Sequence, residues 1–102
     1  MRKKIKRGQK VEVSFSPRER ALVLEHTFTG PELTTMLRRA QLEAGKHVVR
    51  YTLDDLDELL GFVAAEANHS SDRKLRNELD ALHARVRREM ESYDDGRWQQ
   101  AF

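Results

Sequence analysis

Two carboxylate and histidine pairs come closest, by spacing, to a catalytic or metal-binding arrangement. Glu66 precedes His69, and Asp80 precedes His83, by three residues. Helices of a bundle present ligands to paired iron or manganese ions at this spacing. At 100° per residue, however, His69 falls opposite the leucines of its predicted helix and Glu66 lies at their flank. His83 borders an apolar stripe, where a histidine more often hydrogen-bonds to backbone or water than binds a metal ion. We therefore predict no metal site and no cofactor.

Other nucleophilic chemistry has little support in the sequence. The chain has no cysteine, which excludes a thiolate nucleophile and a disulfide. The serines fall at predicted strand edges, helix caps or helix ends, and there is no Gly-x-Ser-x-Gly elbow or glycine-rich phosphate loop. His26 and His47 belong to no motif. We predict that the protein is not an enzyme, that it has no catalytic residue and that it takes no small-molecule substrate; a metal-dependent enzyme is a distant third alternative.

The first ten residues could bind nucleic acid. They carry six of the 19 Lys and Arg residues and no acid. The rest of the chain has 13 Lys and Arg against 17 Asp and Glu, a net charge of −4. Clustered cations neutralise phosphates and give salt-dependent binding to RNA or DNA. No aromatic residue is interleaved for base stacking, and a solvated tail is the alternative. The candidate residues are Arg2, Lys3, Lys4, Lys6, Arg7 and Lys10.

Three Ser or Thr residues each stand three positions before a carboxylate, a spacing typical of helix starts. The hydroxyl accepts a hydrogen bond from a free amide of the first turn, and the acid lies at the positive end of the helix dipole. These pairs are Ser16 with Glu19, Thr29 with Glu32 and Thr52 with Asp55.

The first half of the chain mixes strand and helix patterns. Residues 11–15 alternate apolar and polar side chains, which predicts a strand with one buried face. A short helix follows over residues 18–26, with Phe28 continuing its apolar stripe, and a second helix follows the break at residues 27–30. Residues 40–43 either finish that helix or form a strand. We favour the strand, paired as a hairpin with residues 47–51 across a glycine-containing loop.

The second half predicts two long helices. Thr52 caps a helix that runs to about residue 68, with its leucines in one stripe, and Gly61 begins a strip of small residues where we expect a neighbouring backbone to pass closely. Residues 72–93 form the second helix, whose apolar positions recur every three or four residues. These helices lack the length of apolar sequence that a membrane span needs.

The last helix predicts an interaction surface, because its apolar series extends beyond the expected core. This pattern suits a partner protein or a second copy of the chain. Exposed aromatic residues in the tail add to this expectation, since aromatic side chains often anchor contacts. The predicted surface consists of Val86, Met90, Tyr93, Trp98 and Phe102.

Together, these patterns predict a small α+β protein with a two- or three-stranded sheet and four helices, the last two forming a long antiparallel pair. Residues 1–10 are a basic flexible arm, 11–93 a single domain and 94–102 a frayed tail. The predicted function is a non-enzymatic interaction or regulatory module in the cytoplasm, which uses the last helix as its contact surface and has no membrane partner. The alternative is a nucleic-acid-binding accessory protein acting through the arm.

Overall fold

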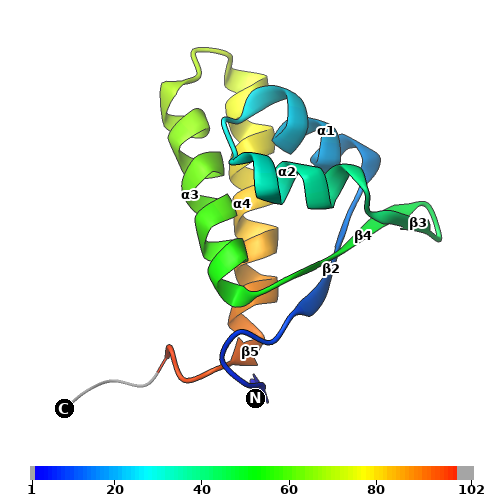
Figure 1. Ribbon diagram of the computed structural model, residues 1–102. Coiled ribbons are helices and arrows are strands. Elements are labelled where there is room, and N and C mark those ends of the chain that lie inside the picture. The colour runs from blue at the N-terminus through cyan, green and yellow to red at the C-terminus, as the bar shows by residue number, and fades with distance from the viewer. Residues whose placement is uncertain (1, 99–102) are drawn as a thin grey trace.

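The computed structural model describes residues 2–98 and has the predicted α+β architecture (Figure 1). Four helices accompany a three-stranded antiparallel sheet and a two-stranded parallel one. In chain order the elements are β1 (Lys3–Lys4), β2 (Val11–Phe15), α1 (Pro17–His26), α2 (Pro31–Arg38), β3 (Gln41–Glu43), β4 (Lys46–Tyr51), α3 (Leu53–His69), α4 (Arg73–Glu91) and β5 (Tyr93–Asp94).

Two of the three predicted capping boxes form. The Ser16 hydroxyl accepts from the Glu19 amide at the start of α1, and the Thr52 hydroxyl accepts from the Asp55 amide at the start of α3, each with the reciprocal bond to the acid. The third prediction is wrong. Gly30 is the N-cap of α2, and the Thr29 hydroxyl is 2.6 Å from the hydroxyl of Thr27 instead.

The hairpin prediction is confirmed. The strands lie in the order β2-β4-β3, and Ala44 and Gly45, with φ of 50° and 80°, form the turn between β3 and β4. Positive φ at both turn residues is what a two-residue hairpin loop of the favoured hand requires. One face of the sheet is buried, because the strand residues alternate as predicted. The buried side chains of β2 and β4 are Val11, Val13, Phe15, Val49 and Tyr51.

The helical pair forms one side of the core. In Figure 1, α3 and α4 lie side by side next to α1 and α2, and β2 and β4 run from the base of this pair toward the projecting β3–β4 hairpin. The two helices bury most of the predicted apolar stripes, with Leu59 as a further buried residue of α3; Leu75 is partly buried, and Tyr93 lies in β5 because α4 ends at Glu91. Tyr51 is fully buried, and its hydroxyl donates a 2.6 Å hydrogen bond to the Leu33 carbonyl, which ties β4 to α2.

Two apolar predictions fail in the region of α1 and α3. Phe28 does not continue the buried stripe of α1, because the helix ends at His26 and the Phe28 side chain is 88% exposed. No backbone passes close to Gly61, which is exposed: a Cβ placed there would have no atom of the described chain within 4 Å. Both residues therefore belong to the surface.

Within residues 2–98, the predicted flexible arm and the start of the predicted frayed tail are folded against each other. Lys3–Lys4 (β1) pairs in parallel with Tyr93–Asp94 (β5), and Ile5 packs against the core. Hydrogen bonds from the Lys3 amide to the Ser92 carbonyl (2.8 Å) and from the Ile5 amide to the Asp94 carbonyl (2.9 Å) hold the two ends together. Among residues 2–98, no helix combines the length and apolar character that crossing a membrane would require.

Candidate functional site

The interaction surface predicted on the last helix is largely internal. Val86 and Met90 are only 1% and 3% exposed, so they belong to the core. Tyr93 and Trp98 are partly buried and pack against it, and the Trp98 ring nitrogen donates a 2.7 Å hydrogen bond to the Tyr93 carbonyl. Phe102 lies outside the described residues. The helix does not overhang the body, because α3 packs along it and Arg85 in its second half hydrogen-bonds the Ser14 carbonyl of β2.

The structure gives the predicted arm residues different surroundings. The Arg2 Nε donates to the Glu91 carbonyl at 2.7 Å, and its guanidinium carbon lies 5.0 Å from the centre of the Trp98 ring. Lys3, Lys4, Lys6 and Lys10 are exposed, and none of them forms an ion pair with any residue between 2 and 98. These lysines are the part of the predicted nucleic-acid site that is available to a ligand.

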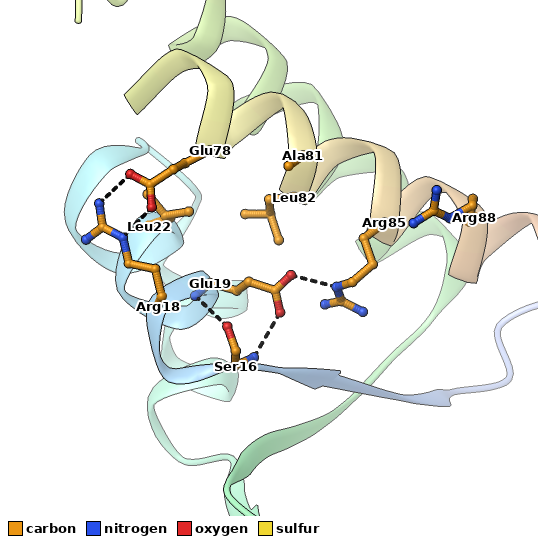
Figure 2. A pocket seen from close by; sticks show the side chains of 9 residues that line it. All are labelled: Ser16, Arg18, Glu19, Leu22, Glu78, Ala81, Leu82, Arg85 and Arg88. Carbon is orange, nitrogen blue, oxygen red and sulfur yellow. Dashed lines mark hydrogen bonds and ion pairs between the residues drawn. The ribbon is translucent and has the colours of Figure 1, made fainter. Parts of the chain in front are cut away.

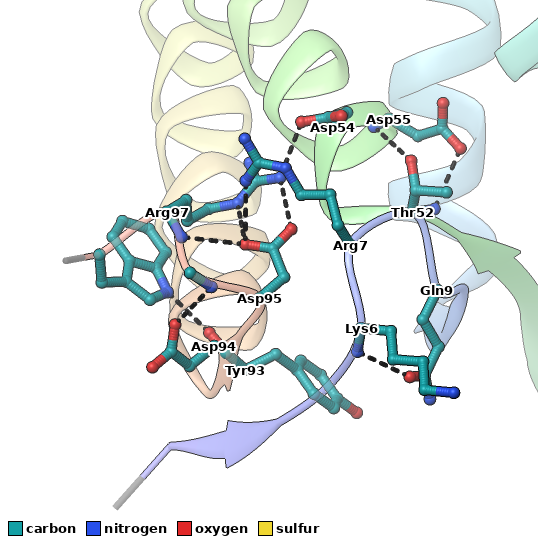
Figure 3. Close-up of polar contacts among 12 residues, drawn as sticks. Lys6, Arg7, Gln9, Thr52, Asp54, Asp55, Tyr93, Asp94, Asp95 and Arg97 are labelled. Carbon is teal, nitrogen blue, oxygen red and sulfur yellow. Dashed lines mark hydrogen bonds and ion pairs between the residues drawn. The ribbon is translucent and has the colours of Figure 1, made fainter.

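Arg7 contributes to a cluster of charges that fastens the arm to the chain end (Figure 3). At its centre, the Asp95 carboxylate accepts from the Arg97 Nε at 2.9 Å and Nη2 at 2.8 Å, and its side chain is only 2% exposed. Arg97 also bonds Asp54 of α3 at 2.7 Å, and an Arg7 nitrogen lies 3.6 Å from Asp95. Hydrogen bonding by Arg97 lowers the pKa of Asp95 to about 2. The partners of this cluster satisfy one another, which indicates a structural role.

A hollow of about 480 Å³ lies between α1 and α4, where charged side chains surround an apolar floor that includes Leu22 and Leu82 (Figure 2). Arg18 donates to both oxygens of Glu78 at 2.7 and 2.8 Å, and Arg85 donates to Glu19 at 2.6 Å. The Arg18 hydrogen bonds lower the pKa of Glu78. Because Glu19 and Glu78 are already paired with arginines, neither is free to act as a general base. These ion pairs connect α1 to α4 across the hollow.

The two carboxylate and histidine pairs are not brought together as a metal centre. Glu66 and His69 line one hollow on the outside of α3, and neither Asp80 nor His83 lines it. Within the part of the chain that the structure describes, no group of three or more His, Asp or Glu side chains is arranged to hold a metal ion.

An apolar surface remains beside this pair. Phe28, Phe62 and Ala65, with Glu66 and His69 at the edge, line a hollow of about 360 Å³ between the α1–α2 connection and the outer face of α3; we call these five residues the Phe28 patch. In Figure 1 the connection lies next to α3. Large exposed apolar groups that gather in a hollow mark binding surfaces more often than single ones do. The Phe28 patch is the strongest candidate site.

Sequence reasoning missed the Phe28 patch because its two aromatic residues come from separate segments. Phe62 lies off the leucine stripe of α3, a signal that would have placed it on the outer face. Phe28 fits the apolar stripe of α1 by spacing, and only the end of that helix at His26 shows it to be exposed. Leu42, 65% exposed on β3, lines none of the hollows described above and needs no functional explanation.

Comparison of the chain with protein-family models, curated proteins and solved structures finds no match.

Proposed function

We propose that this protein is a non-enzymatic interaction module that binds a partner protein through the Phe28 patch. The observation that carries the proposal is the 88% exposure of Phe28 at the edge of an apolar hollow. An exposed phenylalanine leaves apolar area in contact with water that docking would remove, and aromatic side chains in such positions are frequent binding hot spots. This surface replaces the last helix as the proposed contact site.

The surrounding structure supports this proposal by holding the patch on rigid elements. Phe62 lies in the middle of α3, whose opposite face is fully packed through Leu56, Leu60 and Val63. Thr27 and Thr29 fix the connection that carries Phe28, since the Thr27 hydroxyl donates to the Val23 carbonyl at 2.7 Å and lies 2.6 Å from the Thr29 hydroxyl. Preformed surfaces lose less conformational entropy when a partner binds.

Site-specific photo-crosslinking tests the proposal. A benzophenone amino acid at position 28 should give one dominant crosslinked protein in the cells that express this chain. The same group at position 42, another exposed apolar site, serves as the matched control. The crosslink at position 28 should disappear when Phe62→Ser is added. Equal crosslinking from both positions, or a crosslink that survives Phe62→Ser, would contradict the proposal.

A nucleic-acid-binding role through the basic arm is the second candidate. It is favoured by the exposure of Lys3, Lys4, Lys6 and Lys10 without ion-pair partners in the described chain. Lys10 also lines a separate hollow beside the sheet, which mixes Arg39 and Arg50 with Glu12 and Glu43. The role predicts RNA or DNA retention that falls with added salt. Replacing the four lysines by glutamine should abolish retention; unchanged retention would exclude this role.

A further inference from the structure

We infer that the partner segment which docks on the Phe28 patch is cationic, with Lys or Arg flanking a large apolar side chain. This inference rests on the proposed function, because it names the kind of partner that the same surface takes. Two properties of the patch lead to it: the apolar lining of its hollow and the acidic character of the segments that form it.

The apolar lining calls for an apolar anchor. Phe28, Phe62 and Ala65 line the hollow with Glu66 and His69, its surface is mostly apolar, and its volume of about 360 Å³ can accept one or two large side chains. Ala65 and its neighbour Gly61 are both exposed and have little or no side chain. A partner can therefore approach the outer face of α3 closely, as amphipathic helices do when they lie in apolar grooves.

The charge around this lining is negative. Glu66 borders the hollow, and Glu58 stands four residues before Phe62, on the same side of α3. The two segments that form the patch, residues 21–37 and 51–72, contain neither Lys nor Arg; of their eight acids, Asp54 is paired with Arg97, and Asp55 and Asp72 cap helices. All 19 Lys and Arg residues lie elsewhere in the sequence, and the Arg76 guanidinium reaches only the Ser70 carbonyl (2.8 Å) beside His69. Charge complementarity at the edge of an apolar interface steers and selects the partner, so a cationic segment is favoured.

The same charges argue against a second copy of the chain as the occupant. Two copies that met through their Phe28 patches would bring two Glu66 side chains, and two Glu58 side chains, into one interface. Like charges placed together in this way oppose association. Symmetric dimers need a self-complementary surface, and this patch has no base other than His69 to supply the opposite charge.

Fluorescence polarisation with three synthetic helical peptides tests the inference on the full chain. The first peptide carries Leu and Phe along one face and Lys on the flanks. The second keeps the apolar residues and replaces every Lys by Glu, and the third keeps the Lys residues and replaces Leu and Phe by Ser. The first peptide should bind most tightly, and its affinity should fall as salt is raised.

Variants locate the binding. Phe28→Ser should weaken the first peptide about tenfold or more, since it removes an aromatic anchor, and the exposure of Phe28 means that the fold is kept. Glu66→Lys should weaken it about fivefold. Glu43→Lys on the β3–β4 hairpin changes the net charge equally, away from the patch, and is the matched control.

Each contrary outcome has a distinct meaning. If the Lys and Glu peptides bind equally and both are lost with Phe28→Ser, the cationic partner is wrong but the patch remains the contact surface. If Phe28→Ser changes no affinity, or if no peptide binds, the inference is overturned, and the crosslink at position 28 then decides the proposed function independently. If sedimentation shows a dimer that Phe28→Ser converts to a monomer, the occupant of the patch is a second copy of the chain and not a cationic partner.

Discussion

Arg85 and Glu19 lie 66 residues apart in the chain, and the Arg85 Nε donates a 2.6 Å hydrogen bond to the Glu19 Oε2. The other oxygen of Glu19 completes the capping box of α1 by accepting from the Ser16 amide. Arg85 also donates to the Ser14 carbonyl at 2.8 Å and lies over the Phe15 ring. One arginine of α4 therefore fastens the end of β2 and the start of α1.

Replacing Arg85 by alanine should lower the free energy of unfolding by about 1.5–3 kcal/mol, the range for hydrogen bonds that involve a charged group. Arg87→Ala is the control, because the Arg87–Glu91 pair is an exposed i,i+4 contact that contributes less than about 0.5 kcal/mol. Urea unfolding followed by circular dichroism measures both. Equal stabilities of the two variants would show that Arg85 does not fasten β2 and α1.

Tyr51→Phe should destabilise the protein by about 1 kcal/mol, because it removes the buried hydrogen bond to the Leu33 carbonyl and keeps the ring. The same measurement applies, with Tyr93→Phe as the control, since the Tyr93 hydroxyl makes no hydrogen bond within residues 2–98 and its side chain is only partly buried. A Tyr51→Phe protein as stable as the parent would mean that this hydroxyl does not contribute to the attachment of α2.

Gly61→Ala should raise the free energy of unfolding by about 0.5–1 kcal/mol, because alanine is the better helix former and the added Cβ meets no atom within 4 Å. Gly45→Ala should do the opposite, since the φ of 80° in the hairpin turn strains any residue with a Cβ. Thermal unfolding of both variants checks the prediction. A loss of stability with Gly61→Ala would indicate packing at that face which the structure does not contain.

Acid should release the arm from the chain end. The pKa of Asp95 is lowered from 3.8 to about 2, chiefly by its hydrogen bonds with Arg97, so the folded state favours the charged carboxylate. The stabilisation is complete above about pH 5 and is lost as the pH falls toward 2. Trp98, the single tryptophan, reports on this region by fluorescence.

Asp95→Asn should remove most of this pH dependence, because the ion pairs with Arg97 and Arg7 are then absent at every pH. Asp94→Asn is the matched control: the Asp94 carboxylate bonds only the Gly96 amide among the described residues. A Trp98 signal that changes equally with pH in the parent and Asp95→Asn proteins would contradict the assignment to Asp95.

Local sequence signals predicted most of the fold. The capping boxes at Ser16 and Thr52, the alternation in β2 and the helical periodicity of α3 and α4 each act within a few residues, so the sequence alone identifies them. The Thr29 prediction failed because Gly30 caps α2 without a side chain. The spacing shows which Ser and Thr residues could act as N-caps, and tertiary contacts determine which of them do.

Long-range contacts account for the errors at the site. The parallel pairing of β1 with β5 joins residues about 90 positions apart, and no periodicity in the sequence signals it. Val86 and Met90 are core residues for another reason: α3 packs closely along α4. The apolar surface that remains exposed is set by where the connection between α1 and α2 crosses α3, and it includes Phe28.

The most direct test of the central claim is a nuclear magnetic resonance titration of the isotopically labelled full chain with the peptide that carries Leu, Phe and Lys. Backbone amide shifts should change at residues 28, 62, 65 and 66 and leave the arm and the exposed face of α4 unaffected. Shifts centred on the arm or on α4, or spread evenly over the surface, would contradict the Phe28 patch as the contact site.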